Sequence, residues 1–207
     1  MRIIEAETDL AEGRAHLTAV CPIWADALPK LTLPMRRRSD GFAAILDAII
    51  GQQISIAAAG AIMARLGEAG LVTPSAIRTG GEEGLRACGV SRPKIRYLLG
   101  IVENEPDWLA LRTAPDADVI AALTALPGVG RWTAEIYLAF ALGRSDAFPA
   151  GDLALQEAAR QLYGLDARPD PTALAALAEP WRPWRSVAAR ALWAYYREAK
   201  GREGVRS

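Results

Sequence analysis

One carboxylate and one glycine-containing turn are the features of this sequence best placed to do chemistry. The turn LPGVG (126–130) separates two helical patterns, and Asp152 follows FPAG and precedes LALQEAARQL. Glycine amides beside a free helix N-terminus form a binding site for an anionic oxygen, such as that of a phosphate. The alternative is structural: an ordinary turn between helices, and an Asp152 that only caps the next helix. Each feature alone leaves both interpretations open, whereas their order along the chain is more specific.

Other common catalytic and metal-binding sets have few residues to draw on. His16 is the only histidine and lies far in sequence from the turn, which leaves little basis for a Ser-His-Asp triad or a histidine metal site. Cys21 and Cys88 are the only cysteines, too few for a disulfide framework or a four-cysteine metal cluster. We therefore expect two reduced thiols and no iron–sulfur cluster.

The composition indicates a folded protein rather than a disordered or membrane-spanning one. The chain has 207 residues, 51% of them hydrophobic, with 24 basic and 24 acidic side chains. Charge is uneven, because residues 180–207 hold seven basic and two acidic side chains, while residues 1–28 hold two basic and five acidic ones. Such asymmetry is compatible with a basic face on a neutral protein. The acidic N-terminus has no long apolar run, so we expect a soluble, cytoplasmic protein.

Helical patterns dominate, and alternating strand-like runs are nearly absent. Ser55 is a candidate N-cap and Gly67 a candidate C-terminal stop for one such helix. The patterns predict an all-α protein of roughly eight to ten helices. The helical segments are FAAILDAII, SIAAAGAIMARLG, TPSAIRTG, GEEGLRACG, SRPKIRYLLGIVENE, DADVIAALTAL, RWTAEIYLAFAL, DLALQEAARQLYG and WRPWRSVAARALWAYYREAK.

The hairpin, the helix after it and the downstream aspartate resemble the helix-hairpin-helix DNA glycosylase superfamily. Four further segments are similar to the bacterial 3-methyladenine DNA glycosylase II family and occur in its order: AIIGQQIS, GVSRPKIRYLLGI, GRWTA and WRPWRSVAARALW. They span about residues 42–196, most of the chain. Because little sequence precedes residue 35, the resemblance implies the compact form that lacks the family's N-terminal β domain.

The resemblance also implies an arrangement of subdomains. It predicts one helix-hairpin-helix unit, residues 1–207, made of two helical subdomains with the active-site cleft between them. Residues 36–145 would form the central subdomain, with the hairpin at 124–132. The terminal segments, 1–35 and 146–207, would form the second subdomain.

The implied activity is hydrolysis of the N-glycosidic bond of alkylated purines, such as 3-methyladenine, in base excision repair. Positive charge builds on the sugar in the transition state, so a fixed carboxylate nearby stabilises it; Asp152 is the candidate. Bifunctional relatives carry a lysine two residues after the second hairpin glycine, where this chain has Trp132. No lyase activity is therefore expected. A non-enzymatic DNA-binding module and an unrelated helical scaffold remain the alternatives.

Further positions match binding residues of the family. Trp132 and Trp193 match positions that line the pocket for the flipped base, although core packing is the alternative for any tryptophan. Gln53 occupies the position of the side chain that fills the gap in the base stack, where exposed turn residues are the alternative. The amides of the hairpin, Gly128, Val129 and Gly130, would hold DNA phosphate.

The family also suggests one ion and one class of partner. A monovalent cation, Na⁺ or K⁺, would bridge DNA phosphate and the main-chain carbonyls of Thr124, Leu126 and Val129. No other cofactor is expected. The partner would be double-stranded DNA that contains alkylated bases, bound by a monomer.

Overall fold

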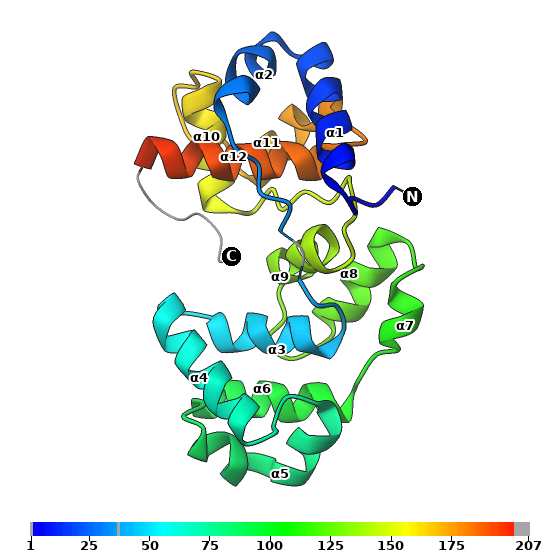
Figure 1. The fold of residues 1–207 in the computed structure, drawn as a ribbon, viewed down its shortest axis with the longest axis vertical. Helices are drawn as coiled ribbons and strands as arrows, with labels where there is room; N and C mark the ends of the chain where they lie inside the picture. The colour runs from blue at the N-terminus through cyan, green and yellow to red at the C-terminus, as the bar shows by residue number, and fades with distance from the viewer. Residues whose placement is uncertain (1, 37, 201–207) are drawn as a thin grey trace. The chain divides into compact units, whose positions relative to one another are not determined.

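The computed structural model describes residues 2–36 and 38–200, and within them every regular element is helical. Twelve α-helices are present in these residues, with two short 3₁₀ segments and one π-helical segment (Figure 1). The only strand-like pairing among them is an isolated antiparallel bridge between Ile3 and Arg144. The expected all-α class is confirmed. Within the same residues, no helix combines the length and the apolar character that a membrane crossing needs.

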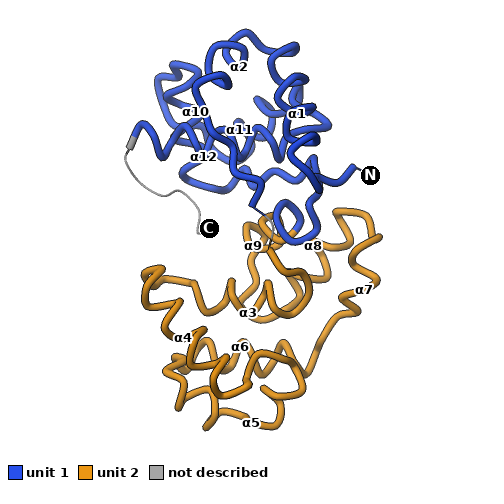
Figure 2. Tube along the Cα trace, in the orientation of Figure 1, with its two compact units in different colours: residues 1–37, 138–207 blue, residues 38–137 orange. Residues whose placement is uncertain are grey.

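The chain divides into two compact units (Figure 2). Unit 1 comprises residues 1–37 and 138–207, and unit 2 comprises residues 38–137. The second boundary lies inside a continuous helical run, because α9 (Arg131–Ile136) passes directly into the π-helical segment η2 (Tyr137–Ala141). No sequence signal of a linker marks such a boundary, and it lies eight residues before the position at 145 suggested by the sequence.

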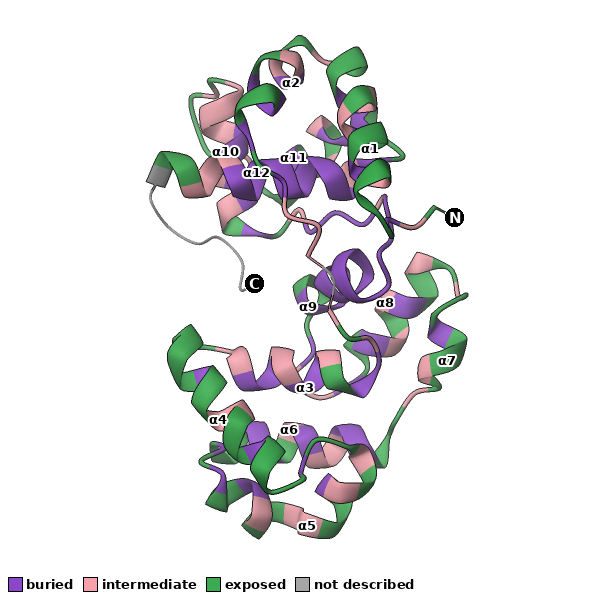
Figure 3. Ribbon diagram, in the orientation of Figure 1, coloured by how far each residue is buried: buried purple, intermediate pink, exposed green. Residues whose placement is uncertain are grey.

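Unit 1 is built around its last helix. That helix, α12, packs against α10, α1 and η3, and the middle of α12 is almost wholly buried (Figure 3). The elements of unit 1 are α1 (Glu7–Val20), α2 (Pro22–Ala27), η1 (Leu28–Lys30), α10 (Leu153–Leu162), α11 (Pro171–Leu177), η3 (Glu179–Trp181) and α12 (Arg185–Lys200).

Close packing in unit 1 depends on a glycine between two helices and on a pair of buried tryptophans. A Cβ on Gly13 of α1 would lie 2.5 Å from Val187 Cγ2 of α12, so only glycine lets the two helices approach this closely. Trp24 and Trp181 are 0% and 1% exposed and meet edge to face, with ring centroids 5.4 Å apart. These tryptophans therefore belong to the core.

Unit 2 is also helical, and its helix α6 packs against both α5 and α3. Its elements are α3 (Phe42–Gly51), α4 (Ile56–Glu68), α5 (Pro74–Ala87), α6 (Arg92–Glu103), α7 (Trp108–Leu111), α8 (Asp116–Thr124) and α9. Ser55 caps α4 as expected, since its hydroxyl accepts a bond from Ala58 N at 3.2 Å.

One helix end differs from the sequence interpretation. Gly67 lies inside α4, and the left-handed residue after the helix is Gly70, with φ +69°. The segments TPSAIRTG and GEEGLRACG are two helical stretches, as expected, because Gly81, with φ +57°, is not helical and kinks α5 between them. Glycine tolerates both the helical and the left-handed conformation, so its position alone does not say which of several glycines ends a helix.

Candidate active site

Asp152 is the N-cap of α10 and is also buried, with 8% of its surface exposed. Its Oδ1 accepts hydrogen bonds from Ala154 N at 2.9 Å and Leu155 N at 3.0 Å. The capping role that the sequence allowed is therefore present. A carboxylate held by two amides at a positive helix end has a fixed orientation.

The structure brings Asp152 together with one of the two predicted pocket tryptophans. Trp193 Nε1 donates to Asp152 Oδ1 at 3.3 Å, and Trp193 is only 4% exposed. Its ring contacts Phe140, with centroids 5.5 Å apart and an interplanar angle of 37°. Trp193 also lines a small pocket, partly open to solvent, together with Arg36, Phe140 and Arg190. Trp193 is therefore a buried side chain that also lines a pocket, and its contact with a flipped base stays a prediction.

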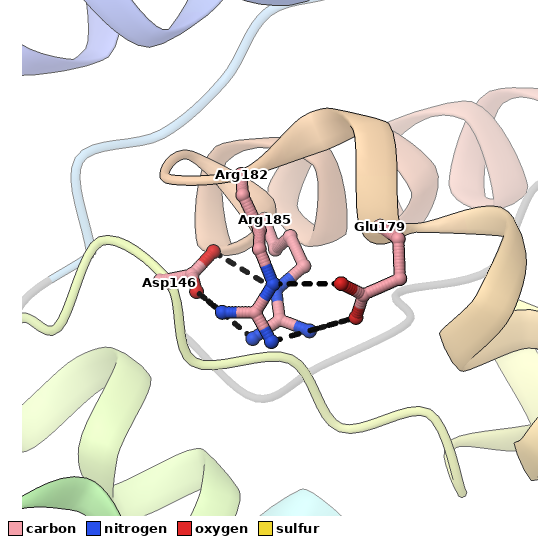
Figure 4. Close-up of polar contacts among 4 residues, drawn as sticks. All are labelled: Asp146, Glu179, Arg182 and Arg185. Atoms are coloured by element: carbon pink, nitrogen blue, oxygen red, sulfur yellow. Dashed lines mark hydrogen bonds and ion pairs between the residues drawn. The ribbon is translucent and has the colours of Figure 1, made fainter.

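The loop that leads to Asp152 is tied to the rest of unit 1. Ser145 N donates to Arg2 O at 3.1 Å, and Ser186 N donates to Ser145 O at 2.8 Å. Asp146 accepts two bonds from Arg185, at 2.8 and 2.9 Å, and one from Arg182, at 2.6 Å (Figure 4). Both arginines also pair with Glu179. These guanidinium groups are engaged with carboxylates, and they hold the loop in place.

The hairpin between α8 and α9 needs glycine at one position and not at the other. Gly128 has φ +78°, and a Cβ there would lie 2.5 Å from the ring of Tyr97. Gly130 is the N-cap of α9 with φ −90°, and a Cβ there would meet no described atom within 4 Å. Of these two glycines, only Gly128 has the positive φ that glycine permits. At Gly130 the absence of a side chain leaves open surface at a helix N-terminus.

The turn between α3 and α4 presents Gln53 in an unusual backbone conformation. Gln53 is exposed and has φ +56°, which is uncommon for a residue other than glycine. Its neighbour Gln52 donates through Nε2 to the carbonyl of Gly128 at 2.9 Å. Lys94 Nζ, itself buried, donates to the carbonyls of Ile50 at 2.7 Å and Gln52 at 2.8 Å. The turn is thereby joined to the hairpin and held at the negative end of α3.

Helix α6 supports both of these elements through one stripe of residues, which sequence reasoning missed. Lys94 holds the α3–α4 turn, Tyr97 packs on Gly128, and a Cβ on Gly100 would lie 2.9 Å from Pro127 Cγ. Their spacing of three places them on neighbouring turns of one face. The mixed types lysine, tyrosine and glycine hid this pattern, because an apolar stripe is the usual signal of a packed face.

The second predicted pocket tryptophan, Trp132, lies in the first turn of α9 and is 45% exposed. Core packing, the alternative that the sequence left open, does not describe it. The π-helical segment that follows begins with Tyr137, whose hydroxyl accepts a bond from Gly41 N at 3.0 Å. Burial raises the pKa of the Tyr137 phenol. π-Helical turns are rare and occur often at functional sites.

The three carbonyls proposed to hold a cation lie at the end of α8 and in the hairpin turn. Thr124 is the last residue of α8, where helix carbonyls lack an intrahelical amide. Leu126 O accepts a bond from Val129 N at 3.2 Å and retains its second lone pair. Oxygen donors at a negative helix end suit a hard monovalent cation. Among the described residues, no three His, Cys, Asp or Glu side chains form a metal-binding group.

Comparison with known proteins identifies the family of this chain. The family model for the HhH-GPD superfamily base excision DNA repair protein matches residues 46–183. DNA-3-methyladenine glycosylase 1 of Schizosaccharomyces pombe is 32% identical over 91% of this chain and 89% of its own. A DNA-3-methyladenine glycosidase from Bacillus halodurans superposes with a TM-score of 0.81 at 29% identity, covering 99% of this chain and 96% of that one.

A structural neighbour was solved with DNA. The 3-methyladenine DNA glycosylase of S. pombe in complex with abasic DNA has a TM-score of 0.76 and 27% identity, covering 95% of this chain and 100% of that one. The family match extends over two thirds of the sequence and includes the hairpin, Asp152 and the loop between them. This chain belongs to the HhH-GPD superfamily of base excision DNA repair proteins.

Proposed function

We propose that this protein is a monofunctional DNA glycosylase that hydrolyses the N-glycosidic bond of alkylated purines, such as 3-methyladenine, in duplex DNA. The observation that carries the proposal is the buried carboxylate of Asp152, fixed by two amides and by the indole of Trp193. Relatives of this chain are named as 3-methyladenine DNA glycosylases, and these names support the same activity.

The chemistry requires stabilisation of a cationic sugar and little acid catalysis. As the base departs, positive charge develops at the anomeric carbon, and a preoriented carboxylate in a partly dry site lowers the free energy of that state. The same carboxylate orients the attacking water and accepts its proton. A base such as 3-methyladenine already carries positive charge, so it leaves as a neutral molecule without a protein acid. One carboxylate is therefore sufficient for this substrate class.

The remaining site residues would bind and deform the DNA. The amides of Gly128, Val129 and Gly130 would contact phosphate, and the open surface at Gly130 suits close approach of a backbone. Gln53 would enter the stack from a turn whose conformation is held by Lys94. Trp132 and Trp193 would stack on the flipped base. A Na⁺ or K⁺ ion held by Thr124, Leu126 and Val129 would add positive charge facing the phosphate.

The competing function is a DNA-binding module without catalysis, which the capping role of Asp152 favours. Base release separates the two. Purified protein would be incubated with duplex DNA treated with dimethyl sulfate, and the free methylpurines would be separated by chromatography. We expect release above the spontaneous rate, and strand breaks only after alkali. Release at the spontaneous rate with DNA binding retained would support the module, and a borohydride-trapped covalent adduct would contradict the absence of lyase activity.

A further inference from the structure

Two arginines of helix α6, Arg92 and Arg96, differ from the other basic side chains of unit 2. Both are exposed, and neither has a hydrogen bond or an ion pair with any described residue. Every other lysine or arginine of unit 2 is paired with a carboxylate or donates to a main-chain carbonyl. The carboxylate-paired group is Arg38, Arg86, Arg112 and Arg131, and the carbonyl-bonded group is Arg65, Arg78 and Lys94.

The sequence around these two arginines contains no acidic side chain. Residues 84–102, from the end of α5 through most of α6, hold four basic residues and no Asp or Glu. Of the four, Arg86 is paired with a carboxylate and Lys94 is buried, so the charge that faces solvent unpaired is that of Arg92 and Arg96. An uncompensated positive segment on a protein with equal numbers of acidic and basic residues marks a surface for an anionic partner.

Helix α6 also carries the residues that hold the α3–α4 turn and the hairpin. Lys94 donates to a carbonyl of that turn at 2.8 Å, and the ring of Tyr97 lies 2.5 Å from where a Cβ on Gly128 would be. Arg96 directly precedes Tyr97, and Arg92 lies one helical turn before Arg96. The two arginines are therefore within one turn of the contacts that fix both loops expected to touch DNA, and they take no part in those contacts.

The spacing of Arg92 and Arg96 gives them no stabilising role within the helix. Like charges four residues apart on a helix repel each other, and no carboxylate of the described residues relieves this repulsion. An external anion would relieve it. The planar guanidinium group donates two parallel hydrogen bonds to a phosphate, so arginine is well suited to this kind of anion.

We propose that Arg92 and Arg96 form a second phosphate-binding surface, which contacts the DNA backbone in addition to the contact made by the hairpin. The inference rests on the DNA binding of the proposed function and not on its catalytic step. Duplex DNA presents closely spaced anionic phosphates along each strand, so two guanidinium groups on successive helical turns can each pair with one. Such contacts contribute affinity and register and do not read the lesion.

The salt dependence of DNA affinity provides the test. Each neutralised phosphate releases counterions, so the logarithm of the association constant falls with the logarithm of salt concentration by about 0.9 per contact. Full-length protein would be titrated, at several salt concentrations, with a fluorescent duplex that contains a stable abasic-site analogue. We expect Arg92→Gln and Arg96→Gln each to reduce the magnitude of this slope by about 0.9, and to weaken binding about five- to tenfold at about 0.1 M salt. The double variant should lose about 1.8 from the slope.

Two controls separate a phosphate contact from other effects. Arg86 is also an exposed helical arginine of unit 2, but it is paired with Glu82 at 3.6 Å. Arg86→Gln is therefore expected to keep the wild-type slope, and all of these exposed variants should keep the wild-type urea midpoint. The second control is an undamaged duplex of the same sequence. A phosphate contact is the same in both duplexes, so the α6 variants should lose the same factor in affinity for each.

The outcomes separate this inference from the proposed function. An unchanged salt slope in the double variant, with wild-type binding intact, would overturn this inference alone. A loss of affinity confined to the abasic duplex would assign the arginines to lesion recognition and would also overturn it. A wild-type protein that binds both duplexes but releases no methylpurine would overturn the proposed activity, and the slope of the variants would still decide this inference. Absent or salt-independent DNA binding by wild type would overturn both.

Discussion

Replacing Asp152 by asparagine should separate its catalytic role from its structural one. Asparagine has nearly the same shape and keeps an Oδ1 acceptor for Ala154 N, Leu155 N and the indole of Trp193. The cap therefore persists, and loss of the negative charge at the helix N-terminus costs about 0.3–1 kcal/mol of stability. With an ordinary free energy of unfolding of about 5–15 kcal/mol, nearly all molecules remain folded.

Base release should respond far more strongly than stability. Removing one preorganised electrostatic contact in an active site costs about 10²–10³ in rate, and a full charge adjacent to a cationic sugar is expected to lie at or above the upper end of that range. Such a loss corresponds to about 4 kcal/mol in the activation free energy. We therefore predict at least roughly a thousandfold slower release of methylpurines under single-turnover conditions, with DNA affinity largely retained.

Asp152→Ala provides the matched comparison. Alanine leaves the two amides and the indole without their acceptor, so we expect a stability loss of about 2–3 kcal/mol by urea unfolding. If Asp152→Asn keeps its rate within about threefold of wild type, the carboxylate is only a cap and the catalytic assignment is wrong. If Asp152→Asn unfolds as readily as Asp152→Ala, the reasoning from the hydrogen-bonded cap is wrong instead.

The remaining predictions concern the hairpin, the lysine beneath the α3–α4 turn, and alkaline pH. Gly128→Ala should lower the free energy of unfolding in urea by at least about 1–2 kcal/mol, because of the positive φ and the adjacent Tyr97 ring. Gly130→Ala should leave that free energy within about 0.5 kcal/mol of wild type. Its affinity for DNA, measured by titration, should nevertheless fall. Equal stability of the two variants would contradict this contrast. Lys94→Met should destabilise the protein by about 1–3 kcal/mol, because the carbonyls of Ile50 and Gln52 lose their donor. An unchanged urea midpoint would show that Lys94 does not stabilise the α3–α4 turn. Burial raises the pKa of Tyr163, so the free energy of unfolding should fall as pH rises past about 10, where the unfolded phenol ionises first. In Tyr163→Phe the free energy of unfolding should fall less steeply with pH. A fall as steep as that of wild type would contradict the role of Tyr163.

The sequence by itself determined the helical class and the identity of the residues most suited to the chemistry. Helix formation depends on local spacing and caps, so Ser55 and Asp152 could be recognised as N-caps from their neighbours alone. The hairpin glycines were likewise visible, because glycine beside proline between two apolar runs indicates a turn.

Tertiary structure decided which distant side chains meet. The bond between Trp193 and Asp152 joins residues 41 positions apart, and the Gln52–Gly128 bond joins residues 76 positions apart. Single-sequence patterns describe neighbours along one element, and they contain no information on such pairs. The same reason explains why Lys94 and Arg190 were missed, since each is a charged residue that becomes buried only through contacts with other segments. A charged side chain on a helix is usually solvated, so only packing reveals the exceptions.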